Sequence, residues 1–77
     1  MSKTKNTDLT ERFPAVLKEL RLQKGISQEE LADRASLHRT YISQIERGLK
    51  SPSLRSLGQI ADALEVTLSN LIKKMEK

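Results

Sequence analysis

Residues 27–48 read SQEELADRASLHRTYISQIERG, and this stretch decides the fold. Ser27 and Glu30 have the spacing of a capping box, in which serine and glutamate satisfy each other's backbone amides at the start of a helix. After a connection of very few residues, a further helix is expected from about His38 to Arg47. The apolar residues expected on the inner sides of these two helices are Leu31, Ala32, Ala35, Ile42 and Ile45.

Two short helices joined so closely have the geometry of a helix-turn-helix, which we place at about residues 28–47. Apolar residues recur at helical spacing on both sides of this motif. Before it, a first helix is expected with Thr10 as its N-cap, Pro14 in its first turn and Gly25 at its end. The residues that share its apolar face are Phe13, Val16, Leu17 and Leu20.

Two more helices are expected after the motif, capped by Ser53 and Thr67. Gly58 lies inside the first of them, and we interpret it as a close contact between helices. The inner face of that helix would consist of Leu54, Leu57, Ile60, Ala61 and Leu64. The last helix would cover about residues 68–76, with apolar residues at Leu68, Leu71, Ile72 and Met75.

The predicted fold class is all-α, a compact bundle of five short helices, because no segment alternates with the period of a β-strand. With 77 residues the chain has room for a single domain, which we place at residues 9–77. Residues 1–8 are polar and lack periodicity, so a flexible N-terminal arm is expected there.

The composition excludes several classes of site. The chain has no cysteine and one histidine, which excludes disulfides and the common zinc spacings, and we expect no metal and no cofactor. No apolar run is long enough for a membrane span or a signal peptide, so a cytoplasmic protein is expected.

The positive charge is unevenly distributed. The net charge is +4, and the basic excess lies in residues 1–25 and in residues 38–55. Such local positive density favours a polyanion such as nucleic acid, although a basic face in contact with solvent has the same composition.

The helix expected at 38–47 has a polar stripe opposite its apolar pair. At about 100° per residue, the positions turned away from Ile42 and Ile45 are Thr40, Ser43, Gln44 and Arg47. All four can form hydrogen bonds and none is acidic, whereas a merely solvated helix in this chain would carry glutamate, as residues 28–35 do. The stripe is therefore a candidate surface for contact with nucleic acid.

Residues 20–64, LRLQKGISQEELADRASLHRTYISQIERGLKSPSLRSLGQIADAL, resemble the Xre/Cro-type helix-turn-helix regulators, which include the lambdoid phage repressors. The motifs KGISQEELA, RTYISQIERG and SPSL occur in the order and at the spacing of that family. HRTYISQIERG followed by a short ending resembles most the controller proteins of restriction–modification systems. The fold implied by this resemblance is the lambda-repressor-like bundle.

The resemblance also implies roles for individual residues. Arg39 and Gln44 match positions that face base edges, where arginine can pair with guanine and glutamine with adenine. The full set of expected base contacts is Arg39, Thr40, Ser43 and Gln44. The expected contacts to DNA phosphates are Ser27, Gln28, His38, Tyr41, Arg47, Lys50 and Arg55, with His38 alternatively a helix cap and Tyr41 at the edge of the stripe.

Arg21 and Glu46 match a family pair that bridges the first and third helices, and we expect a structural ion pair between them. If it is buried, removal of one partner costs on the order of 3–5 kcal/mol because the other charge is left unpaired. Ser36 and Glu65 stand where the family often has glycine, and each is expected to need a positive φ.

Helix-turn-helix domains commonly bind as dimers, with two reading helices about 34 Å apart in successive major grooves. The candidates for the dimer interface are Val66, Leu68, Leu71, Ile72 and Met75. Lysines flank these residues, so the last helix could instead bind a membrane surface, a reading we place behind the dimer.

The resemblance implies a transcriptional regulator that binds double-stranded DNA as a homodimer on a symmetric operator and blocks or recruits RNA polymerase. Its narrower form is an autoregulatory controller of a restriction–modification system. The alternative is an antitoxin, or another protein-interaction module, with a toxin partner and secondary DNA binding. RNA binding ranks lower because two aromatic residues cannot build a stacking platform. An enzyme ranks last, since no nucleophile, base and pocket can be assembled.

Overall fold

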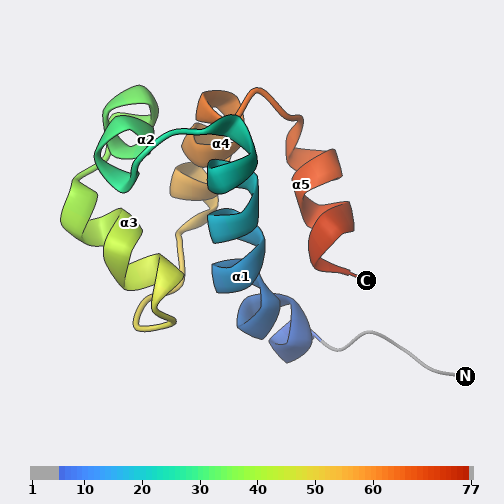
Figure 1. Ribbon diagram of the computed structural model, residues 1–77. Coiled ribbons are helices and arrows are strands. Elements are labelled where there is room, and N and C mark those ends of the chain that lie inside the picture. Colours follow the sequence, from blue (N-terminus) through green and yellow to red (C-terminus); the bar gives the residue numbers. More distant parts are fainter. Residues whose placement is uncertain (1–5, 77) are drawn as a thin grey trace, which may run out of the picture.

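The computed structural model describes the backbone of residues 6–76 and the side chains of residues 9–76. The described chain is helical with short connections and contains no strand in this range, as predicted (Figure 1). Its helices are α1 (Asn6–Lys24), α2 (Gln28–Ala35), α3 (Arg39–Glu46), α4 (Leu54–Ala63) and α5 (Leu68–Met75). Helix α1 runs through the middle of the bundle, with α2 and α3 on one side and α5 on the other (Figure 1).

A single core joins the five helices. Each helix contributes apolar side chains that are fully or almost fully buried, and these pack into one cluster. The largest side chains in it are Phe13, Leu17, Leu31, Ile42, Ile45, Ile60 and Leu71. Helix α3 packs on α1 and α2, whereas α5 packs on α1 and α4.

The first helix begins earlier than predicted. It starts at Asn6, so residues 6–8 belong to α1 and not to an arm, while residues 1–5 of the expected arm lie outside the described residues. Pro14 consequently lies inside the helix, beyond its first turn. An interior proline costs about 3 kcal/mol or more. Burial of Phe13 and Leu17, at about 1.5–3 kcal/mol each, offsets that cost.

Three of the four predicted N-caps are formed; the fourth, Thr10, is wrong because α1 begins at Asn6 and Thr10 lies inside that helix. The side chains of Ser27, Ser53 and Thr67 each accept a hydrogen bond from a backbone N–H three residues later. The capping box at Ser27 is formed in only one direction, because the carboxylate of Glu30 pairs with Arg34 at 3.0 Å.

Ser36 and Glu65 both adopt the left-handed conformation, with φ of 59° and 62°, as their positions predict. Ser36 ends α2, and its backbone N–H bonds to the last carbonyls of that helix. Gln59 of α4 donates a hydrogen bond of 2.9 Å to the carbonyl of Ala35. This hydrogen bond connects α4 to the end of α2, where the turn of the helix-turn-helix begins.

Two expectations for α4 are wrong. Leu54 is 78% exposed, because it is the first residue of the helix and precedes the turn that enters the core. Gly58 is not at a close helix contact, since a Cβ atom at this position would have no neighbour within 4 Å.

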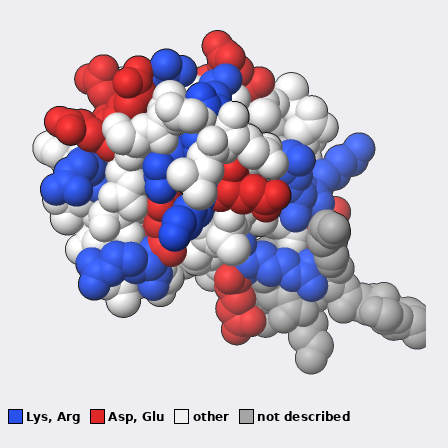
Figure 2. Space-filling model, viewed as in Figure 1, with Lys and Arg blue, Asp and Glu red and all other residues white. Residues whose placement is uncertain are grey.

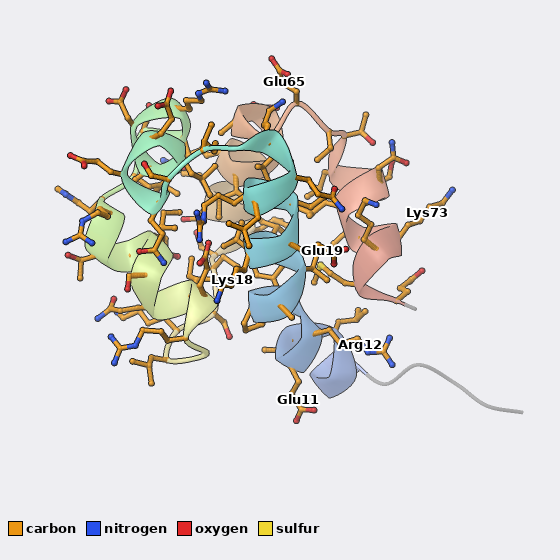
Figure 3. The ribbon with its side chains drawn as sticks, in the orientation of Figure 1. Glu11, Arg12, Lys18, Glu19, Glu65 and Lys73 are labelled. Carbon is orange, nitrogen blue, oxygen red and sulfur yellow. The ribbon has the colours of Figure 1, made fainter. Side chains whose placement is uncertain are left out.

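Polar contacts tie α1 to the C-terminal part of the bundle. Arg12 extends toward the end of α5, where its Nη1 donates to the carbonyl oxygen of Met75 at 3.1 Å (Figure 3). At the other end of α1, Lys24 pairs with Glu65, which projects from the connection between α4 and α5 (Figure 3). Helix α5 is therefore held against α1 near both of its ends.

Candidate nucleic-acid interface

Helix α3 presents a polar face to solvent. Ile42 and Ile45 are fully buried and anchor its inner side in the core. The four expected base-contact residues lie on the other side: Arg39 and Thr40 are exposed, and Ser43 and Gln44 are half-buried. We call these four residues, Arg39, Thr40, Ser43 and Gln44, the reading face. No acidic side chain belongs to it, and it is rigidly oriented by the buried isoleucines.

Most of the residues expected at DNA phosphates are exposed to solvent. His38, Arg47, Lys50 and Arg55, which are expected at DNA phosphates, are all exposed. His38 occupies the N-cap position of α3, as predicted, but its side chain forms no capping hydrogen bond. Ser27 is also exposed, and its hydroxyl caps α2.

Tyr41 links α3 to the start of α4. Its side chain is half-buried, and its hydroxyl oxygen accepts a hydrogen bond of 3.3 Å from the backbone N–H of Ser53. A phenol that accepts this bond still has its own proton to donate. The edge position predicted for Tyr41 therefore agrees with the structure, and its hydroxyl can also serve as a donor to an anion.

The ion pair predicted between Arg21 and Glu46 is formed behind the reading face. Arg21 Nε donates to Glu46 Oε2 at 2.7 Å, and Nη2 donates to Oε1 at 3.1 Å. The two side chains are 10% and 3% exposed. The hydrogen bond to Glu46 raises the pKa of Arg21 above its ordinary value, against the opposing effect of burial. A third bond, of 2.9 Å from Arg21 Nη1, reaches the carbonyl of Ile26 in the connection between α1 and α2.

Glu46 also accepts a hydrogen bond from Gln28, the first residue of α2. Gln28 Nε2 lies 3.0 Å from Glu46 Oε1, and the glutamine side chain is half-buried. The family resemblance implies that Gln28 contacts a phosphate and that Glu46 belongs to the ion pair, and no sequence pattern connects the two residues. Their separation of 18 positions is not a helical spacing, so only the packing of α2 on α3 reveals the contact.

Charge is segregated on this side of the molecule. Figure 2 shows acidic side chains gathered at the upper left, over α2, and basic side chains lower on the left, where α3 and the loop after it lie. The acidic residues of α2 are Glu29, Glu30 and Asp33, and the basic residues of α3 and its loop are Arg39, Arg47 and Lys50. Arg39 belongs to the reading face itself, and the other two basic residues follow it in the chain, which gives this side the positive charge that binding to a polyanion requires.

The structure changes the predicted dimer interface. Leu71 is 0% exposed and Met75 6% exposed, so both belong to the core of one chain, and their assignment to an interface is wrong. Helix α5 packs on α1 and α4, and these two buried residues supply apolar side chains to that packing. Of the other candidates, Leu68 is 37% exposed, and Val66 and Ile72 are half-buried.

The described part of the chain holds neither a membrane-spanning helix nor a metal-binding cluster. Among residues 6–76, no helix is long and apolar enough to cross a membrane. Within the same range, no three His, Cys, Asp or Glu side chains are grouped so that they could hold a metal ion.

Comparison with known proteins agrees with this geometry. The helix-turn-helix family model matches residues 17–71. The control protein C.MunI of Mycoplasma sp is 44% identical over 71 residues, which are 91% of this chain and 96% of that protein. The control protein C.BamHI of Bacillus amyloliquefaciens is 44% identical over 61 residues, covering 78% of this chain and 75% of the relative.

Two solved structures of controller proteins are also similar to this chain. The restriction-modification controller protein C.AhdI from Aeromonas hydrophila superposes with a TM-score of 0.76 at 40% identity, over 84% of this chain and 93% of that one. The wild-type restriction-modification controller protein C.Esp1396I also gives a TM-score of 0.76, at 38% identity over 87% and 90% of the two chains.

Proposed function

Because this chain belongs to the Xre-type family of helix-turn-helix DNA-binding regulators, we propose that it is a sequence-specific regulator of transcription that binds a symmetric operator as a homodimer. The observation that carries the proposal is the reading face of α3, a surface of hydrogen-bonding residues held rigid by Ile42 and Ile45 and flanked by exposed basic residues. Such a surface fits the major groove of double-stranded DNA.

In the proposed complex, α3 lies in the major groove. Arg39 would contact guanine and Gln44 adenine, while Thr40 meets a thymine methyl group and Ser43 makes a weaker contact. The backbone phosphates would be held by the exposed or half-exposed polar residues around the reading face, which are Ser27, Gln28, His38, Tyr41, Arg47, Lys50 and Arg55.

The homodimer would form through the exposed side of α5 and the connection before it. Leu68, Ile72 and Val66 keep apolar surface outside the core. A two-fold interface uses the same patch on both copies, so this short stripe would meet itself. Helix α5 lies across α1 from α3 (Figure 1), so an interface on α5 would leave both reading faces open to DNA.

The restriction–modification controllers among its relatives suggest the narrower role. We propose that this chain controls genes of a restriction–modification system, including its own, by blocking or recruiting RNA polymerase at the operator. The dimer dissociates as its concentration falls, which makes occupancy a steep function of the amount of protein. Such a role places the protein with the DNA, in the cytoplasm.

The test is selection from a random duplex library with purified protein at near-physiological salt. We expect enrichment of a two-fold-symmetric motif with half-sites about 34 Å apart, one turn of the double helix. The matched control is Arg39→Ala/Gln44→Ala, which should fold equally well and enrich no such motif. Weak, salt-sensitive binding without a motif would contradict the proposal and direct the search to a protein partner such as a toxin.

A further inference from the structure

Glu46 connects the reading helix to the start of α2 through a single carboxylate. It accepts two hydrogen bonds from Arg21, and a third from Gln28 Nε2 at 3.0 Å. Glu46 is the last residue of α3, and Gln28 is the first residue of α2. The contact therefore joins the end of one helix of the motif to the beginning of the other.

A carboxylate only accepts hydrogen bonds, so this contact fixes the orientation of the Gln28 amide. The Nε2 atom must face Glu46, and one of its two protons is used there. Without Glu46 the amide could rotate by half a turn and exchange its oxygen and nitrogen atoms. The half-buried Gln28 side chain leaves the second proton of Nε2 available to an acceptor outside the protein.

We infer that Glu46 is a positioning residue for DNA binding, which sets the Gln28 amide so that its second N–H is directed to a backbone phosphate. The inference rests on the proposed function, because it needs a phosphate beside α2. It assigns Glu46 a role beyond the ion pair with Arg21: the same carboxylate neutralises the buried Arg21 and orients a contact with the operator. Gln28 touches the phosphate, and Glu46 acts through it.

The test must separate orientation from stability. Removal of Glu46 alone leaves Arg21 buried without its partner, which destabilises the fold whatever Glu46 does for DNA. Arg21→Met/Glu46→Met removes both charges and keeps similar volumes, and such apolar replacements of buried ion pairs are often neutral for stability. This double variant is therefore the background that lacks an acceptor for Gln28.

The experiment is a cycle of operator affinities, with Gln28→Met made in the wild-type protein and in Arg21→Met/Glu46→Met. A hydrogen bond to a charged group accounts for about a tenfold change in affinity, so Gln28→Met should weaken wild-type binding about tenfold. In the double variant the same substitution should change affinity less than about twofold, because the amide there is no longer oriented. Lys50→Met is the matched control and should cost the same in both backgrounds.

If Gln28→Met costs about tenfold in both backgrounds, Glu46 is structural only and the inference is overturned. Failure of wild-type protein to bind any selected duplex would instead contradict the proposed function. A second measurement needs no variant at position 46. By NMR of the free wild-type protein, one side-chain amide proton of Gln28 should exchange slowly with solvent, and fast exchange of both protons would contradict the inferred orientation.

Discussion

Lys24 Nζ lies 2.8 Å from Glu65 Oε1. Lys24 is the last residue of α1 and Glu65 lies in the turn after α4, so the ion pair connects these two elements. Glu65 has a φ of 62°, a conformation that glycine adopts without strain and glutamate does not. The carboxylate supplies a contact between α1 and the α4–α5 connection that glycine would lack.

The hydrogen bond from Lys24 lowers the pKa of Glu65, and Arg34 adds a weaker effect at longer range. Lys24→Met should therefore raise the pKa of Glu65 toward its ordinary value, as measured by NMR titration of the side-chain carboxyl. Because the pKa of the folded state lies below that of the unfolded state, the pair stabilises the fold at neutral pH. That contribution is lost as pH falls through the folded pKa. Arg34→Met is the control and should raise the Glu65 pKa less.

Ser36→Gly should increase the free energy of unfolding by about 0.5–1 kcal/mol. A residue with a Cβ atom pays about 1–2 kcal/mol for the left-handed conformation, and the greater freedom of glycine in the unfolded chain cancels part of the gain. Thermal unfolding measures the change. Ser36→Ala is the matched control, and equal stabilisation by both variants would show that φ is not the cause.

Gly58→Ala should stabilise the protein by up to about 1 kcal/mol, the difference in helix propensity between the two residues. Apart from the neighbouring backbone of its own helix, no atom lies within 4 Å of the position that the new Cβ would occupy, so the propensity gain should not be opposed by a clash. Chemical denaturation is the suitable measurement. A loss of stability would mean that another helix approaches Gly58 after all.

Arg39→Ala should weaken operator binding by about 1–3 kcal/mol and relax the preference at one base position. Lys50→Ala should weaken binding to all duplexes alike and reduce its salt dependence, as expected for a phosphate contact. Affinities for the selected operator and for single-base variants of it distinguish the two patterns. If Arg39→Ala behaved as Lys50→Ala should, Arg39 would be a phosphate contact.

Leu68→Glu should give a folded monomer that binds the operator weakly, because it places a charge on the exposed side of α5. Leu71→Glu should not fold, since a charge in the core has no partner there. Analytical ultracentrifugation and circular dichroism report the two outcomes. A dimer that persisted in Leu68→Glu would place the interface elsewhere.

The sequence predicted the helices best where local chemistry determines them. Ser27, Ser53 and Thr67 are caps because a hydroxyl can bond to the N–H three residues on, which needs no tertiary contact. The start of α1 was placed too late. The polar residues before Leu9 give no periodic signal, and a proline such as Pro14 is expected in the first turn of a helix.

The burial of individual residues and the contacts between helices depend on tertiary packing, which the sequence alone does not reveal. Leu54 and Leu71 are equally apolar and both fit a helical stripe, yet one is exposed and the other is fully buried. Which side of a short helix meets a neighbour depends on the directions of the other helices. The hydrogen bond between Gln28 and Glu46 could not be predicted for the same reason, whereas the pair of Glu46 with Arg21 was predicted from the family resemblance.

The Arg12 contact with the end of α5 has a consequence for how two copies would be spaced. Helices α3 and α5 have no extensive contact with each other, and each packs on α1. In a dimer joined through α5, the packing of α3 and α5 on α1 would therefore set the distance between the two reading faces. Changes that tilt α5 on α1, such as loss of the Arg12 bond at 3.1 Å, would alter the preferred length of the spacer between half-sites and leave the preferred bases unchanged.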